Sequence, residues 1–250
     1  LSSTIRRAMR IYDNSRLYPV WRDALTRGQS IEKEAIFLSR LLKQQGVRTV
    51  LDLGGGCGTH ARLLQDEGFD VTVLDASKEE LDAAMRKGLT TIHCRFEEIH
   101  LEKRYDSAMS IWTTFPPYVS DPEGQKRVFS HLSGIVDKMM IFDQSNFAML
   151  PECIDETYSG MQDNHELTVR RKGTFDGKVR RLRYEHRYLD RCSMIEQEWH
   201  DDEVIRYCSV EDQASFLGPI WRCVGKYGDF DGAAYEEGSS DRLISVWGRT

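Results

Sequence analysis

The sequence predicts an α/β protein built on a mainly parallel sheet. Over about residues 45–145, short apolar runs alternate with segments of helical periodicity. Strands and helices that alternate at this spacing form parallel βαβ units with right-handed crossovers. From about residue 165 to 208, β-like runs follow one another with turn signals such as Gly173 and Asp176-Gly177 between them. Short connections of this kind favour antiparallel pairing, so this second pattern predicts an antiparallel β insert.

Capping residues and glycines mark the starts and ends of the expected helices. Ser30 precedes the first helix, which carries Glu32 and Glu34 in its first turn and ends near Gly46. Its apolar stripe comprises Ile31, Ala35, Leu38 and Leu42. The other helices are expected at 60–67, between Ser77 and Gly88, from Asp121-Pro122 onwards and from Ser209 onwards. Ser77 and Glu80 have the spacing of a capping box, in which each side chain bonds to the other residue's backbone.

The expected strands divide the chain into segments. They span 49–53, 71–75, 91–94, 107–112 and 139–142 in the parallel part, 179–189 and 194–200 in the insert, and 221–230 and 243–247 near the end. We expect a separate N-terminal segment at 1–30, an α/β core at 31–145, an antiparallel insert at 146–208 and the last part of the core at 209–250.

Composition narrows the class of protein. The chain has 250 residues, a net charge of −6 and a pI of about 5.7. A nucleic-acid-binding protein is more often basic, so no nucleic-acid partner is expected. No apolar run reaches the ~20 residues that a membrane helix needs, and the first residues lack the apolar stretch of a signal peptide. Six scattered cysteines without a Cys-x-x-Cys pair indicate neither zinc nor disulfides, and predict a cytoplasmic protein without a metal site.

The most informative segment is the run from Val50 to His60, where a buried strand leads into a glycine cluster and a helix start. Gly54, Gly56 and Gly58 alternate, which lets the backbone turn sharply and approach a ligand closely. The helix that follows points its free N–H groups into this turn. Such a turn at the carboxyl end of a strand predicts a nucleotide-like ligand.

The run resembles motif I of the class I S-adenosylmethionine (SAM) dependent methyltransferases, an acidic residue followed by Gly-x-Gly-x-Gly. Asp52, Gly54, Gly56 and Gly58 fill this pattern. The resemblance implies a Rossmann-like fold with a seven-stranded sheet that closes with an antiparallel hairpin, and it implies SAM as cofactor. Residues 56–61 also fit the Gly-x-Gly-x-x-Ala form of the dinucleotide fingerprint, and Asp75 follows it, so the glycines alone leave a NAD(P) enzyme open.

The resemblance implies which residues bind the cofactor. Asp52, Gly54 and Gly56 would form the glycine turn, and Asp75 would accept hydrogen bonds from the ribose hydroxyls. Ala76, Phe96 and Glu97 would surround the adenine, and Trp112 would form a wall of the pocket. Tyr12 and Tyr18 would belong to a mobile lid. The insert would cover the active site or form a dimer contact, and the chain is similar to bacterial N-methyltransferases that act on small metabolites.

One histidine is a candidate base. Along 182–188 the alternation places His186 on the apolar face of a strand, opposite Arg183 and Arg187. His186 could accept a proton from the acceptor, or it could be a satisfied core histidine. The sequence thus predicts methyl transfer to a small molecule, first of all to an amine nitrogen. An O-methyltransferase, a non-catalytic SAM-binding subunit and a NAD(P) enzyme remain alternatives, and a homodimer is possible.

Overall fold

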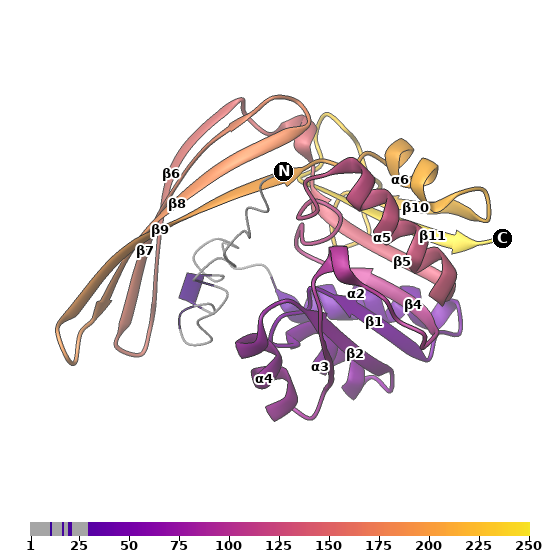
Figure 1. Cartoon of the computed structure of the whole chain (residues 1–250), viewed down its shortest axis with the longest axis horizontal. Helices are drawn as coiled ribbons and strands as arrows, with labels where there is room; N and C mark the ends of the chain where they lie inside the picture. Colours follow the sequence, from indigo (N-terminus) through magenta and orange to yellow (C-terminus); the bar gives the residue numbers. More distant parts are fainter. Residues whose placement is uncertain (1–10, 12–16, 18–19, 22–29) are drawn as a thin grey trace.

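The computed structural model describes Ile11, Leu17, Val20, Trp21 and residues 30–250 of the chain. Its core is a seven-stranded sheet in the order β10-β11-β5-β4-β1-β2-β3 (Figure 1). The strands are β1 (Thr49–Leu53), β2 (Asp70–Asp75), β3 (Thr90–His93), β4 (Tyr105–Ser110), β5 (Val136–Ser145), β10 (Trp221–Tyr227) and β11 (Arg242–Arg249). The strands β1 to β5 are parallel, whereas β11 runs antiparallel to both β5 and β10. The predicted parallel sheet with a closing antiparallel hairpin is confirmed.

Helices cover both faces of this sheet. On one face lie α2 (Ile31–Gln44), α3 (Thr59–Asp66) and α4 (Lys78–Arg86), and on the other lie α5 (Pro122–Ile135) and α6 (Val210–Leu217). The predicted caps form: the side chains of Ser30, Asp121 and Ser209 each accept a hydrogen bond from a backbone N–H of the first turn. Because apolar layers close both faces, the carboxyl edge of the parallel strands is the part of the core that remains for polar groups.

The second sheet has four antiparallel strands in the order β6-β7-β8-β9. They are β6 (Cys153–Gln162), β7 (His165–Phe175), β8 (Val179–Asp190) and β9 (Ile195–Arg206). Figure 1 shows this sheet projecting from the core as a long curved blade. The antiparallel insert is confirmed, but its first strand begins at Cys153, in a segment for which no strand was expected. The two short helices η1 (Phe96–Glu98) and η2 (Phe147–Met149) lie in connections.

The root of the blade is tied to the loop after β4. The N–H of Arg206, the last residue of β9, donates to the carbonyl of Pro117 at 2.9 Å, and the amide of Gln125 donates to the carbonyls of Pro116 and Arg206. Buried Ile11, Leu17 and Trp21 pack with the inner side of the blade in one apolar cluster. The blade is therefore anchored next to the carboxyl edge of the parallel sheet.

Candidate functional site

The glycine turn after β1 has the geometry that its sequence predicts. Gly54, Gly56 and Gly58 all have positive φ, at 69°, 53° and 70°. Residues with a side chain rarely adopt this conformation, which explains the glycines at these places. The Gly54 N–H donates to the carbonyl of Leu74 at 2.6 Å, which ties the turn to β2.

A buried acid supports the turn from below. Asp52 on β1 is only 3% exposed, and a Cβ at Gly55 would overlap its Oδ2. Burial raises the pKa of Asp52 to about 7; the nearby His60 lowers it and the carboxylate of Asp75 raises it further. The motif allows any residue at position 55, but here only glycine fits. The backbone at Gly55 passes directly over the Asp52 carboxyl group, which leaves no space for a side chain.

Asp75 ends β2 and reaches into the turn. Its Oδ2 accepts a hydrogen bond from the Gly56 N–H at 2.9 Å, and its Oδ1 accepts one from the Ser77 N–H at 2.8 Å. Burial raises the pKa of Asp75, while these backbone donors lower it. Ala76 beside it is exposed, and its carbonyl receives a hydrogen bond from His93 at 3.0 Å. An anchored carboxylate with lone pairs to spare thus stands at the edge of the turn.

The predicted capping box at α4 forms only in part. The Ser77 side chain accepts a hydrogen bond from the Glu80 N–H at 3.3 Å, but the Glu80 carboxyl does not reach back. It lies instead against the glycine turn, where its Oε2 would be 3.5 Å from a Cβ at Gly56. Glu80 is 2% exposed, and burial raises its pKa to about 7, with a further increase from Asp75. Besides Asp52 and Asp75, the site thus contains the buried carboxyl of Glu80, a residue predicted only as part of a helix cap.

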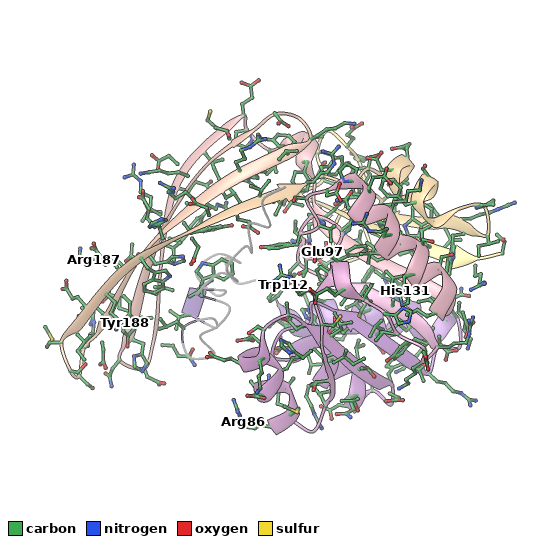
Figure 2. The ribbon with its side chains drawn as sticks, viewed as in Figure 1. Arg86, Glu97, Trp112, His131, Arg187 and Tyr188 are labelled. Atoms are coloured by element: carbon green, nitrogen blue, oxygen red, sulfur yellow. The ribbon has the colours of Figure 1, made fainter. Side chains whose placement is uncertain are left out.

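The short helix η1 brings an aromatic side chain to the turn. The Cζ atom of Phe96 lies 3.1 Å from the place that a Cβ would take at Gly54, and the Phe96 ring contacts Phe115 at 5.5 Å between centroids. Thr114 would overlap that same Cβ. Glu97 is exposed, and Figure 2 shows Glu97 and Trp112 at the edge of the core that faces the blade.

Trp112 lies two residues beyond the end of β4, which stops at Ser110 rather than at the predicted 112. Trp112 and Thr113 have positive φ, at 65° and 61°, a conformation that costs a non-glycine residue about 1–3 kcal/mol. Asp143 on β5 holds this bend: its Oδ2 accepts from the Trp112 N–H at 2.6 Å, and its carbonyl accepts from the Thr113 N–H at 3.0 Å. Two strained residues at a strand end are typical of a functional site.

Two acidic side chains that no motif predicts, Asp143 and Glu34, hold Trp112. Asp143 is fully buried and forms a bidentate ion pair with Arg242 of β11, whose Nε donates at 2.6 Å. The Oε2 of Glu34 on α2 accepts from the Trp112 indole at 2.8 Å and contacts His60 Nε2 at 2.6 Å. A signal for Glu34 existed: it lies four residues before Leu38, on the apolar face of its helix, where an acid needs an explanation.

The inner face of the blade carries charge as well. Arg180 on β8 is 6% exposed, yet no carboxylate among the described residues lies within ion-pair distance and none of their groups accepts a hydrogen bond from it. Burial lowers its pKa and neighbouring Arg171 lowers it further, while Tyr184 and two acids raise it. Glu203 on β9 is also buried; burial raises its pKa, and hydrogen bonds from Tyr118 and Tyr184 lower it. Arg180 is thus a buried cation on the inner face of the blade and not part of a solvated strand face.

His186 lies on the inner face of the blade, as the alternation predicts. Its side chain is fully buried, stacks on Trp199 at 4.8 Å and contacts Asp201 at 3.1 Å between Nε2 and Oδ2. A carboxylate on the neighbouring strand thus lies close to the ring, but neither ring nitrogen of His186 makes a hydrogen bond. Its catalytic role stays a prediction.

The two tyrosines of the predicted lid, Tyr12 and Tyr18, lie outside the described residues. Within the described ranges, no group of three or more His, Cys, Asp or Glu side chains is arranged to hold a metal ion. The helices of that same part of the chain are all too short or too polar to cross a membrane.

Comparison with known proteins identifies the domain. Residues 50–136 match a family described as a methyltransferase domain. The chain carries the domain of the class I SAM-dependent methyltransferases. The predicted family is confirmed, and SAM is the cofactor of this family. The match begins in β1 and ends at β5, so it contains the glycine turn, Asp75 and Trp112.

Relatives of this methyltransferase domain share more limited sequence identity. A glycine/sarcosine N-methyltransferase of Aphanothece halophytica is 28% identical over 139 residues, which are 52% of this chain and 52% of that protein. The chain thus spans about half the length of this curated relative. A SAM-dependent methyltransferase from Clostridium acetobutylicum is 16% identical, with a TM-score of 0.79 over 94% of this chain and 98% of that one. The sugar N-methyltransferase KedS8 of a Streptoalloteichus species is 16% identical, with a TM-score of 0.77 over 100% of this chain and 96% of that one. These two structures therefore share the fold of the described part of the chain over most of its length.

Proposed function

We propose that this protein transfers a methyl group from SAM to the nitrogen of a small amine. The observation that carries the proposal is the glycine turn with Asp75 anchored at its edge, 2.9 Å from the Gly56 N–H. Asp52, Gly54 and Gly56 would hold the amino-acid part of the donor, and Asp75 the ribose. Phe96, Ala76 and Glu97 would border the adenine, and Trp112 would close the pocket beside the sulfur.

Methyl transfer to a neutral amine does not require a general base from the protein. SAM supplies a methyl group that its sulfonium already makes electrophilic. A neutral amine would take this methyl group without help from a base, and its nitrogen would lose the extra proton to solvent once the product leaves the site. The protein has to orient the acceptor in line with the breaking bond and exclude water. A hydroxyl acceptor would need a base, and His186 would be its candidate.

The inner face of the blade supports a more specific acceptor, a small amine that also bears an acidic group. Arg180 is a buried guanidinium without an acidic partner among the described residues, and a buried cation is costly unless it is paired. A ligand carboxylate would supply the pair with two parallel hydrogen bonds. A hydrogen bond from Tyr118 to Glu203 connects this face to the loop after β4. The glycine/sarcosine N-methyltransferase named above is consistent with this acceptor class.

Two measurements test the proposal. Calorimetry is expected to detect binding of S-adenosylhomocysteine (SAH) but not of NADH, and Asp75→Ala is expected to weaken SAH binding about 100-fold, because charge-assisted hydrogen bonds to the ribose are lost. Binding of NADH in place of SAH would favour the alternative dinucleotide reading. A thermal melt of Asp75→Ala provides the folding control.

The second measurement follows methyl transfer from SAM to glycine, sarcosine, glycinamide and an amino sugar. Faster turnover of the two acids than of glycinamide is expected, and Arg180→Met should raise KM for the acids alone. SAH binding without turnover of any amine would instead favour a non-catalytic subunit or a hydroxyl acceptor.

A further inference from the structure

Glu34 is a buried carboxylate in which one oxygen accepts hydrogen bonds and the other accepts none. It is 2% exposed and lies in the first turn of α2. Its Oε2 accepts from Trp112 Nε1 at 2.8 Å and contacts His60 Nε2 at 2.6 Å. Its Oε1 is buried as well, yet it has no hydrogen-bond partner. A buried acceptor left unsatisfied costs stability, so such an atom calls for a ligand.

The position of Glu34 indicates which ligand. His60 comes two residues after Gly58, the last glycine of the turn, and Trp112 comes two residues after the end of β4. The strands β1 and β4 are neighbours in the sheet, so these two segments meet at its carboxyl edge. The rings of His60 and Trp112 are 5.1 Å apart, edge to face, and Glu34 bridges them. The carboxylate therefore lies where the glycine turn faces the end of β4.

Charge around this point favours a cation. The Asp75 carboxyl borders the glycine turn, and the Arg242 guanidinium is already neutralised by its ion pair with Asp143. Glu34 raises the pKa of Arg242 as well, which shows that its field reaches the same region. The donor carries two positive groups, the sulfonium and the α-ammonium, and one carboxylate. An α-ammonium has three N–H donors and can satisfy a buried carboxylate oxygen.

We propose that Oε1 of Glu34 accepts a hydrogen bond from the α-ammonium group of the bound donor. The inference rests on the proposed function, because it needs SAM in the glycine turn. Glu34 then has two tasks: Oε2 holds Trp112 and His60, and Oε1 recognises the amino-acid end of the donor. The first turn of α2 thus becomes part of the cofactor site.

The variant Glu34→Gln separates these two tasks. The amide oxygen can replace Oε2 and keep the bonds to Trp112 and His60, while the amide NH₂ replaces Oε1 and repels an ammonium. Calorimetry compares three ligands: SAH, its deamino analogue, which keeps the carboxylate, and 5′-methylthioadenosine, which lacks the whole amino-acid end. We expect Glu34→Gln to weaken SAH about 10- to 100-fold and to leave the other two ligands unchanged.

The controls distinguish the possible failures. Glu32→Gln makes the same chemical change at an exposed position of the same helix turn and should change no affinity. The wild-type protein should itself prefer SAH to the deamino analogue by at least about tenfold, a result that needs no variant to fold. Equal losses for all three ligands would mean that Glu34 only positions Trp112, and unchanged SAH binding would show that Oε1 has no part in it; either overturns the inference while the proposed function stands. No SAH binding by the wild-type protein would overturn both.

Discussion

The two sheets of this chain use charge in opposite ways. The seven-stranded sheet is apolar on both faces, and its buried charged groups gather at the carboxyl edge, around the glycine turn and the end of β4. The four-stranded blade carries charge on both faces. Its outer face has cross-strand ion pairs, which include Arg170–Asp155, Lys172–Glu185 and Arg183–Asp202.

The difference shows what each sheet contributes. Two apolar faces supply the hydrophobic energy that folds the chain. Exposed ion pairs add little stability, but they keep a broad strand surface soluble. The charged groups on the inner face of the blade, such as Arg180 and Glu203, are costly to bury, so their presence favours a role in binding. A dimer contact through the blade stays a prediction, and the ion-paired outer face is a poor candidate for it.

The largest expected effect is a loss of stability that is greater in the core of the seven-stranded sheet than in the core of the blade. Phe142 on β5 is fully buried and contacts Phe115 and Phe129. Phe142→Ala should reduce the free energy of unfolding by about 3–5 kcal/mol, because it leaves a cavity between packed rings. Phe175→Ala in the half-buried part of β7 should cost about half as much. Urea denaturation measures both, and equal losses would contradict the contrast between the sheets.

Breaking the ion pair at the strand edge should have the next largest effect. Asp143→Asn removes a fully buried charge opposite Arg242 and leaves that guanidinium unpaired, at a cost of about 3 kcal/mol. It also weakens the bond that holds the Trp112 N–H, so SAH affinity should fall. Asp202→Asn, in an exposed pair of the blade, is the matched control and should change stability by less than about 1 kcal/mol. Similar effects of the two variants would show that burial does not distinguish these pairs.

A smaller effect depends on pH. Burial raises the pKa of Glu80 from its usual 4.5 to about 7 in the folded chain. Between these values the folded chain holds a proton that the unfolded chain has lost, so this group reduces stability as the pH rises through that window. Glu80→Gln removes the penalty. The variant should gain about 1–3 kcal/mol relative to the wild-type protein between about pH 5 and pH 8 in denaturation experiments. A pH-independent difference would mean that Glu80 titrates normally.

The sequence predicted the parallel core well, because caps, glycines and buried apolar strands act locally. The closing hairpin and the helix starts at Ser30, Asp121 and Ser209 followed from the same signals. The first strand of the blade, Cys153–Gln162, was missed because its residues alternate only weakly between exposed and half-buried positions as an edge strand. Edge strands depend on their neighbours for pairing more than on their own pattern.

Only the part of the candidate site that comes from one continuous segment of the chain was predicted. The glycine turn and Asp75 lie in one βαβ unit, so a local motif identifies them. Glu34 and Asp143 come from α2 and β5 and meet Trp112 only in the folded chain. Glu80 shows how a local rule fails: the capping-box pattern is present, but the glycine turn beside it leaves room for the carboxyl, which lies there instead.

The smallest effect tests whether the outer face of the blade stabilises the fold at all. Arg183 and Asp202 face each other on β8 and β9, with two hydrogen bonds of 2.7 and 3.0 Å, and both are more than half exposed. A double-mutant cycle with Arg183→Ala and Asp202→Ala should give a coupling energy of about 0.2–1 kcal/mol that shrinks with added salt. A coupling above about 2 kcal/mol that persists in high salt would mean that the pair is shielded from water, and would make the outer face a plausible contact surface after all.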